Sequence, residues 1–215
     1  MADIFRDRIH AGRLLAEKLL QAIGVQLNMM VLGIPRGGVV TARSVADQVN
    51  APLSVIVSRK LRAPYNPELG IGAVSEHDAL YVNWELVHEL GITEDYLKKE
   101  VEYQKKRVQE YVLKFRGGAP LSLKGSTAVI VDDGVATGAT VIAAAIAARN
   151  AGASKVVVAT PVIAEDVAGL VARYCDQLVW VLRPRILYAV GMYYEDFSEV
   201  TDEEVLSLLR SSTPQ

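Results

Sequence analysis

Short runs of apolar residues alternate along this chain with segments of helical periodicity. Continuous apolar runs bounded by turn residues predict strands that are buried on both faces, and parallel strands are joined by crossovers that are usually helices. The alternation therefore predicts an α/β fold, with a mostly parallel, twisted sheet that carries helices on both faces. The predicted strands are residues 29–34, 53–58, 127–131, 155–160 and 178–182, and the helices between them are residues 39–49, 141–151 and 165–174.

Both ends of the chain carry the pattern of a further helix. Residues 4–23 place apolar side chains near helical spacing with charges between them, which predicts an amphipathic helix. Near the C-terminus, Thr201 is followed three residues later by Glu204, and this capping box predicts a closing helix.

The middle of the chain interrupts the alternation. Residues 59–75 are rich in Pro, Gly, Arg and Lys, which predicts a long loop that leads to a short strand at 71–74. Thr93 is the predicted N-cap of a highly charged helix that runs to about Phe115 with only a narrow apolar stripe. Such a helix is usually a solvated element that rests on the domain by one edge, and a lid or a subunit contact is the alternative.

Composition fits one globular domain, residues 1–215, with a flexible loop and helix inserted at about 59–116. The 215 residues are 51% hydrophobic and 22% charged, with a formal net charge of -2 and a pI of about 6.0. That charge balance gives no reason to expect nucleic acid as a partner. A single cysteine, no signal-peptide pattern and no apolar run of membrane-spanning length predict a cytoplasmic protein without a membrane partner.

Candidate chemistry begins where the predicted strand at 127–131 ends. The string that follows is Asp132-Asp133-Gly134-Val135-Ala136-Thr137-Gly138-Ala139-Thr140, directly before a helix. Small residues let several main-chain N–H groups point into one concavity, and the helix start and the threonines add positive potential and donors, which suits a phosphate dianion. The two acids suit the hydroxyls of a sugar attached to that phosphate, or a magnesium ion near it. An ordinary strand-to-helix loop with solvent-facing acids is the plain alternative.

The whole string resembles the signature with which type I phosphoribosyltransferases bind 5-phosphoribosyl 1-diphosphate (PRPP). The string has neither the Gly-Lys-Thr of a Walker loop nor the Gly-x-Gly-x-x-Gly of a dinucleotide site. The resemblance implies that Asp132 and Asp133 hold the ribose hydroxyls. It also implies that the 5-phosphate is bound by Val135, Ala136, Thr137, Gly138, Ala139 and Thr140.

Two further segments resemble the places where that family binds pyrophosphate. Pro35-Arg36-Gly37-Gly38 follows the first strand, where the family has a turn, often with a strained peptide bond, that contacts the diphosphate. Arg59-Lys60 resembles the pair before the mobile loop of orotate and adenine phosphoribosyltransferases, so residues 61–69 are the predicted flap. A plain turn and a solvated basic loop are the alternatives. The resemblance implies that pyrophosphate is bound by Arg36, Gly37, Gly38, Arg59 and Lys60, and that catalysis rests on Asp132, Asp133, Arg36 and Lys60.

A small C-terminal hood at about 183–200 is the expected acceptor site. Tyr188-Ala189-Val190-Gly191 resembles the stretch with which purine phosphoribosyltransferases stack and read the base, which implies Tyr188 as the stacking ring and the Ala189 backbone as the reader. A packed aromatic cap is the alternative. Ala136 stands where hypoxanthine-guanine enzymes carry Asp, which argues against a 6-oxopurine. The chain looks closest to bacterial phosphoribosyltransferase-like proteins without an assigned acceptor.

The resemblance implies transfer of 5-phosphoribose from PRPP to a nitrogenous acceptor, with a nucleobase favoured, and release of pyrophosphate. Mg²⁺ bound mainly through PRPP is the implied cofactor. No metal site made of protein side chains is expected, because His10, His77 and His88 lack ligand spacing. A homodimer is implied by the family alone. The alternatives are a non-catalytic regulator that senses PRPP or nucleotides, and an enzyme that acts on another phosphosugar.

Overall fold

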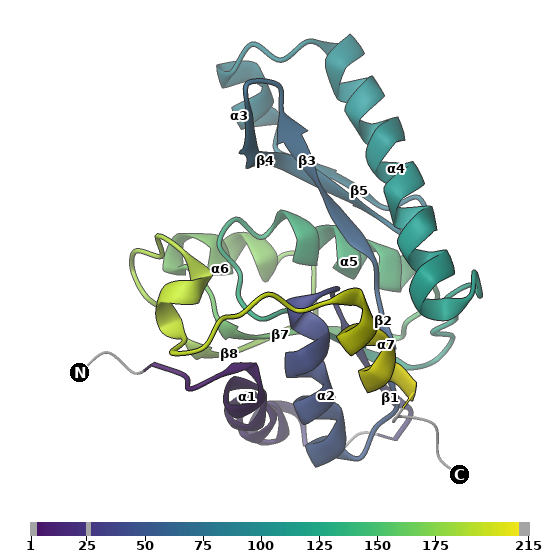
Figure 1. Cartoon of the computed structure of the whole chain (residues 1–215), viewed down its shortest axis with the longest axis vertical. Helices are drawn as coiled ribbons and strands as arrows, with labels where there is room; N and C mark the ends of the chain where they lie inside the picture. The colour runs from purple at the N-terminus through teal and green to yellow at the C-terminus, as the bar shows by residue number, and fades with distance from the viewer. Residues whose placement is uncertain (1–3, 25–26, 211–215) are drawn as a thin grey trace.

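The computed structural model describes residues 4–24 and 27–210, and a five-stranded parallel sheet lies at its centre (Figure 1). All neighbouring strands of this sheet run parallel, in the order β2-β1-β6-β7-β8. The predicted α/β fold with a mostly parallel sheet is therefore confirmed. The strands are β1 (Met29–Gly33), β2 (Leu53–Val55), β6 (Thr127–Val131), β7 (Lys155–Val162) and β8 (Gln177–Leu182).

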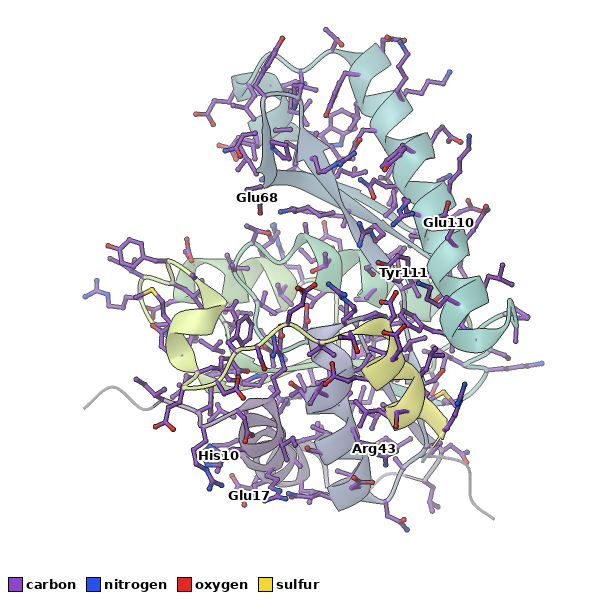
Figure 2. All side chains as sticks on the ribbon, viewed as in Figure 1. His10, Glu17, Arg43, Glu68, Glu110 and Tyr111 are labelled. Atoms are coloured by element: carbon purple, nitrogen blue, oxygen red, sulfur yellow. The ribbon has the colours of Figure 1, made fainter. Side chains whose placement is uncertain are left out.

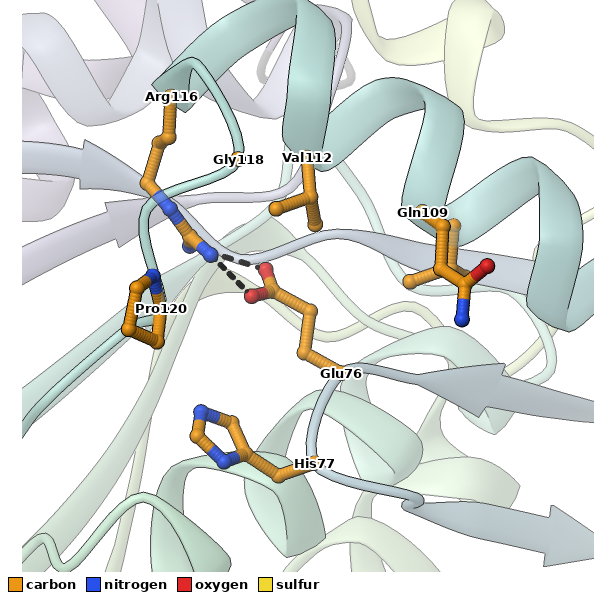
Figure 3. A pocket seen from close by; sticks show the side chains of 8 residues that line it. Glu76, His77, Gln109, Val112, Arg116, Gly118 and Pro120 are labelled. Atoms are coloured by element: carbon orange, nitrogen blue, oxygen red, sulfur yellow. Dashed lines mark hydrogen bonds and ion pairs between the residues drawn. The ribbon is translucent and has the colours of Figure 1, made fainter.

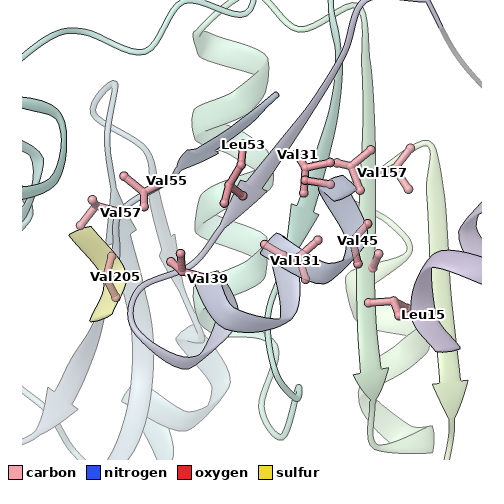
Figure 4. Close-up of a cluster of buried hydrophobic side chains, with 14 of the residues drawn as sticks. Leu15, Val31, Val39, Val45, Leu53, Val55, Val57, Val131, Val157 and Val205 are labelled. Atoms are coloured by element: carbon pink, nitrogen blue, oxygen red, sulfur yellow. The ribbon is translucent and has the colours of Figure 1, made fainter. Parts of the chain in front are cut away.

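Helices cover both faces of this sheet because its strand residues point alternately to either side and are apolar on both. Val31 and Val157 pack with Leu15 and Val45 in one buried cluster (Figure 4), whereas their neighbours in sequence pack in a second cluster on the opposite face. The first face carries α1 (Arg8–Ile23), α2 (Gly37–Val49) and α7 (Asp202–Arg210), and the second carries α5 (Ala139–Asn150) and α6 (Glu165–Val171).

A second, antiparallel sheet is formed by the inserted segment, and this corrects the predicted loop. Residues 59–75 are not a long loop with a short strand at 71–74, because β3 and β4 pair along most of that length and leave a tight turn between them. Gly70 and Gly72 interrupt the run of apolar and β-branched residues by which a strand is recognised in a sequence. Gly72 in β4 lies so close to the Tyr81 main chain of β5 that a Cβ would clash with it, so the strand needs a residue without a side chain there. The strands are β3 (Ser58–Ala63), β4 (Asn66–Ser75) and β5 (Leu80–Val82).

The antiparallel sheet and the helix that follows it form an inserted lobe, which stands over α5 (Figure 1). The helix α4 (Glu94–Arg116) lies along the outer side of this lobe. Ala73 of β4 packs on α5. The predicted charged helix is confirmed: Thr93 caps α4 by accepting from the Tyr96 N–H, and the helix ends at Gly117 with φ 61°. Its buried face contains polar residues as well as apolar ones, namely Leu97, Glu100, Gln104, Val108 and Phe115.

The ends of the chain differ in part from the predicted pattern. The first helix begins at Arg8 with Asp7 as its N-cap, whereas Phe5 before it forms a β-bridge with Tyr194. The closing capping box is confirmed, since the Glu204 N–H donates to the Thr201 hydroxyl at 3.1 Å. A short helix, α3 (Trp84–Glu89), was not predicted. Within residues 4–24 and 27–210, no helix combines the length and the apolar character needed to cross a bilayer.

Candidate active site

A cavity of about 320 Å³ lies at the carboxyl ends of β1 and β6, where β3 and α4 close its other side. This edge of a parallel sheet is where open α/β folds bind ligands. The cavity brings together predicted site residues from three distant segments, namely Arg36, Gly37, Arg59, Lys60, Asp132, Asp133 and Thr140. Its lining also includes Arg62 of the predicted flap, and Ser58 and Gln104, for which the sequence predicted no role.

The acid pair is arranged so that each carboxylate keeps one oxygen without a protein partner among the described residues. Asp132 Oδ1 accepts from the Asp133 main-chain N–H at 3.0 Å, which leaves Oδ2. Asp133 Oδ2 accepts from Arg8 Nε at 2.7 Å, which leaves Oδ1. Two adjacent acceptors at the wall of one cavity match the two adjacent hydroxyls of a pentose.

Burial raises the pKa of both acids, and the charge of Asp133 adds to the shift of Asp132. Removal from water, followed by the negative charge of Asp133, raises the pKa of Asp132 well above its ordinary range. Burial also raises the pKa of Asp133, although the Arg8 guanidinium opposes this shift. Without a ligand, ionisation of both buried carboxylates therefore raises the free energy of the folded protein. A ligand group that donates hydrogen bonds to the carboxylates would stabilise their ionised form.

Arg8 holds the acid pair in place, and no pattern in the sequence singled it out. Its guanidinium is bonded to Asp133, donates through Nη1 to the Ser198 carbonyl at 2.8 Å, and lies 3.9 Å from the centre of the Phe197 ring. The Arg8 side chain is only 10% exposed. One buried cation thus connects the start of α1, the acid pair and the C-terminal hood.

The turn after β1 packs directly against the acids. A Cβ on Gly37 would overlap Asp133 Oδ2, and a Cβ on Gly38 would approach Asp132 Oδ1 to 2.9 Å, so both positions need glycine. The peptide bond between Pro35 and Arg36 is cis.

Beyond the two acids, the loop leads into an uncapped helix start. Gly138 is the N-cap of α5, with φ 79° and no side chain that caps the helix. Among the described residues, the main-chain N–H groups from Ala136 to Val141 donate to no protein atom. Val135 does not belong with them, because its side chain is buried and its N–H already donates to the Val162 carbonyl at 2.8 Å. The Val135 N–H is therefore not available to a phosphate in this structure.

A basic wall faces the acids across the cavity. Lys60 donates through Nζ to the main-chain oxygen of Glu68 at 2.6 Å, within the β3–β4 hairpin. Arg59 lies with its guanidinium 5.3 Å from the centre of the Tyr111 ring. Tyr111 belongs to α4 and is labelled in Figure 2. Arg62, the third cation, is paired with Glu100 at 2.8 Å.

The C-terminal hood contacts the loop at residues 132–140, called the acid loop below, through residues other than the predicted Tyr188 and Ala189. Tyr194 donates its hydroxyl to the Asp133 carbonyl at 2.5 Å, and Val190 occupies the space that a Cβ on Gly134 would take. Tyr188 is 81% exposed, and neither it nor Ala189 lines the cavity. Tyr194 and Phe197 pack with ring centres 4.9 Å apart, which is the packed cap that was the alternative for these aromatics.

A larger cavity, of about 360 Å³, lies between the C-terminal part of α4 and the turn after β4, and it contains none of the predicted site residues (Figure 3). Its charged residues satisfy each other: Arg116 is bonded to both carboxylate oxygens of Glu76, and Glu76 also accepts from the Val57 N–H at 2.8 Å. The cavity at the acid pair is therefore the better candidate for the active site, although it is the smaller of the two. In the part of the chain that the structure describes, no group of three or more His, Cys, Asp or Glu residues could hold a metal ion.

Known proteins are similar to this chain in sequence and in fold. Residues 6–179 match the phosphoribosyl transferase domain. A Mycobacterium tuberculosis (strain H37Rv) protein that carries the provisional name of a phosphoribosyl transferase is 41% identical over 207 residues, which is 96% of this chain and 46% of that protein. The chain thus spans about half the length of the curated relatives it matches.

Solved structures also have folds similar to that of this chain. The crystal structure of TT1426 from Thermus thermophilus has a TM-score of 0.80 and 38% identity, and it covers 98% of this chain and 100% of that chain. The AQ2163 protein from Aquifex aeolicus has a TM-score of 0.52 and 14% identity, with 86% of this chain and 78% of that chain covered. The second likeness concerns the fold alone.

Proposed function

Because the chain belongs to the phosphoribosyl transferase family, we propose that it transfers 5-phosphoribose from PRPP to a nitrogenous acceptor and releases pyrophosphate. In this reaction the bond between ribose C1 and the diphosphate oxygen breaks, and its electron pair leaves with pyrophosphate. A bond from C1 to the acceptor nitrogen forms, and the proton of that nitrogen passes to solvent. One observation carries the proposal. Each carboxylate of the acid pair has one oxygen without a protein partner, and the loop that follows has main-chain N–H groups that donate to no described protein atom.

The phosphoribose end of PRPP fits the acid loop. The main-chain N–H groups from Ala136 to Val141 and the hydroxyls of Thr137 and Thr140 bind the 5-phosphate, which also gains from the positive end of α5. The free oxygens of Asp132 and Asp133 accept from the two ribose hydroxyls.

The diphosphate end fits the basic wall and the turn after β1. Arg36, Arg59 and Lys60 neutralise the charge that builds on the leaving pyrophosphate, and Gly37 and Gly38 let the diphosphate approach the main chain. Mg²⁺ prefers hard oxygen ligands and keeps several waters, so it would enter bound to diphosphate oxygens, with the acid pair as a further source of such oxygens. When bound, the metal lowers the charge on the leaving group.

Catalysis in this proposal is mainly positional and electrostatic. The acid pair favours the positive charge that develops on the ribose as the bond to pyrophosphate breaks, and the cations favour the negative charge on the leaving group. The β3–β4 hairpin with Lys60 and Glu68 stands over the cavity, where closure would exclude water that would otherwise hydrolyse the sugar.

The acceptor is proposed to be a nucleobase other than a clear 6-oxopurine. Ala136 in place of an acid and the Tyr188-Ala189 stretch of the hood support this only by family resemblance. Tyr188 is exposed and so has a free ring face for stacking. A homodimer in the cytoplasm remains an expectation of the same kind, and light scattering after size exclusion measures the oligomeric state.

Glu199 is expected to compete with pyrophosphate for Arg36. The two side chains are paired at 2.5 Å, with 36% of Arg36 and 79% of Glu199 exposed. Because exposed pairs are weak, Glu199→Gln is expected to tighten pyrophosphate binding by only about threefold, and added salt should remove the difference. Calorimetric titration measures this, with Glu203→Gln on α7 as the control. Weaker binding by Glu199→Gln would mean that Glu199 positions Arg36 instead of competing for it.

Turnover of a panel of free bases with labelled PRPP tests the function itself. Formation of a nucleotide together with pyrophosphate supports the enzyme. PRPP binding without turnover of any base supports the non-catalytic sensor, and loss of PRPP without nucleotide supports action on a phosphosugar alone. Failure of the protein to bind PRPP with Mg²⁺ would contradict the proposed transfer.

A further inference from the structure

Gln104 is a buried polar residue that faces the substrate cavity from α4. It is 1% exposed, lines the cavity with the basic residues of β3, and donates through Nε2 to Glu100 Oε1 at 2.8 Å. A polar side chain in the buried stripe of an amphipathic helix is costly unless its hydrogen bonds are satisfied.

The orientation of the Gln104 amide is set by Glu100. Arg62 donates to Glu100 through its main-chain N–H at 3.1 Å, through Nε at 2.8 Å and through Nη2 at 3.2 Å. Burial alone would raise the pKa of Glu100, but the hydrogen bonds from Arg62 and Gln104 lower it, so the carboxylate is ionised and accepts only. The amide nitrogen of Gln104 must therefore face Glu100, and the amide oxygen is directed elsewhere.

Two buried atoms at this wall of the cavity have no partner in the part of the chain that the structure describes. They are Gln104 Oε1, an acceptor, and Arg59 Nε, a donor. Both residues line the same cavity, and the two atoms are not bonded to each other. An unsatisfied buried polar atom costs on the order of 1–3 kcal/mol, so a pair of them on one cavity is explained most simply by a ligand group that satisfies both.

We propose that Gln104 is a specificity-determining residue of the PRPP site, where Gln104 Oε1 and Arg59 Nε together bind one ligand O–H group. The inference rests on the proposed function. A hydroxyl accepts from Arg59 and donates to Gln104 at the same time. Phosphate oxygens only accept at neutral pH, so they satisfy Arg59 and leave Gln104 unpaired. Each ribose hydroxyl has a single hydrogen, which the acid pair accepts in the proposed function, so the group is a water carried by magnesium.

Gln104→Met tests this with little change of side-chain volume, because it removes the amide oxygen and leaves Glu100 paired with Arg62. Gln109→Met is the matched control, since Gln109 is on the same helix but lines the larger cavity beyond it. Calorimetric titrations use three ligands: PRPP with Mg²⁺, pyrophosphate with Mg²⁺, and ribose 5-phosphate without metal. Gln104→Met is expected to weaken PRPP binding about tenfold, and Gln109→Met to leave it unchanged.

The other two ligands separate the sources of the O–H group. A parallel loss for magnesium pyrophosphate alone is the expected result, and it identifies metal-bound water. A parallel loss for ribose 5-phosphate alone would mean that a ribose hydroxyl donates to Gln104 instead of to an acid, and it would overturn the assignment to metal-bound water. Unchanged affinity of Gln104→Met for all three ligands, or an equal loss in Gln109→Met, would overturn the inference while the proposed function stands. Failure of the wild type to bind any of the three would remove the proposed function, and the inference with it.

A measurement on the wild type keeps the inference testable if Gln104→Met does not fold. The side-chain NH2 resonances of Gln104 are expected to shift when PRPP and Mg²⁺ are added, because a hydrogen bond to the amide oxygen polarises the whole amide. Resonances of Gln104 that stay in place at saturation, while main-chain signals of Thr140 move, would overturn the inference.

Discussion

Asp132→Asn is expected to weaken binding of PRPP with Mg²⁺ about a hundredfold and, at the same time, to raise the stability of the free protein at neutral pH. The loss of affinity follows because hydrogen bonds to a charged acceptor are worth about 1.5–3 kcal/mol, and a neutral amide replaces the carboxylate that accepts from the ribose. The gain in stability follows because burial and the charge of Asp133 raise the pKa of Asp132, so its ionised form is disfavoured in the folded protein.

The raised pKa of Asp132 makes the stability of the folded protein depend on pH. Between the ordinary pKa of an aspartate and the raised pKa of Asp132, the folded protein binds more protons than the unfolded chain. The free energy of unfolding therefore falls as pH rises through this window, and Asp132→Asn lacks that fall. Urea denaturation at a series of pH values measures the difference. Equal pH profiles of the two proteins would mean that the carboxylate is not buried beside a second charge.

Asp176→Asn serves as the contrasting control, because it lies outside the candidate active site. The Asp176 carboxylate loses some solvation, yet hydrogen bonds from the Val156 N–H and Arg149 lower its pKa. Its ionised form contributes stability above the ordinary pKa, and that contribution is lost as pH falls through the lowered one. Asp176→Asn is therefore expected to lower stability at neutral pH and to leave PRPP affinity unchanged, the opposite of Asp132→Asn on both counts.

Arg8→Met is expected to lower the free energy of unfolding by about 3 kcal/mol, because it leaves the Asp133 carboxylate buried without its cation. The side chains of the pair are only 10% and 16% exposed, so solvent screens the lost charge poorly. The substitution also removes the contact of the guanidinium with Phe197 and its hydrogen bond to the Ser198 carbonyl. Urea denaturation at neutral pH measures the loss.

The same variant has a characteristic pH response. Without Arg8, burial raises the pKa of Asp133 further, and protonation of the carboxyl then relieves the unpaired charge. The deficit of Arg8→Met relative to wild type should therefore shrink as pH falls. Arg13→Met, at an exposed position of the same helix, should stay within about 0.5 kcal/mol of wild type. A loss below about 1 kcal/mol in Arg8→Met would contradict the assigned role of the cation.

The features that the sequence predicted correctly are those with a local signal. Buried strands are continuous apolar runs, and helix ends such as Thr93 and Thr201 have capping residues a few positions away. The loop at 132–140 is likewise a contiguous string, so its placement at the edge of the sheet followed from the strand before it. The secondary structure predicted for residues 59–75 was wrong because the glycines of β4 are required by the close approach of β5, which cannot be read from neighbouring residues.

The residues that were missed act over long separations in the chain. Arg8 is bonded to Asp133, which is 125 positions away, and Tyr194 to Asp133, which is 61 away. Gln104 was read as part of a solvated helix, and only the packing of α4 on β3 brings it to the cavity. The one signal in the sequence that could have identified it is its position with Leu97, Glu100 and Val108 on one helical face.

A crystal structure of the protein with PRPP and Mg²⁺ tests the central claim most directly. We expect the 5-phosphate to lie against the main-chain N–H groups at the start of α5, with one ribose hydroxyl on Asp132 and its neighbour on Asp133. The diphosphate should lie toward Arg36 and Lys60. A phosphate bound away from residues 136–141, or a ribose that leaves both acids without contact, would contradict it.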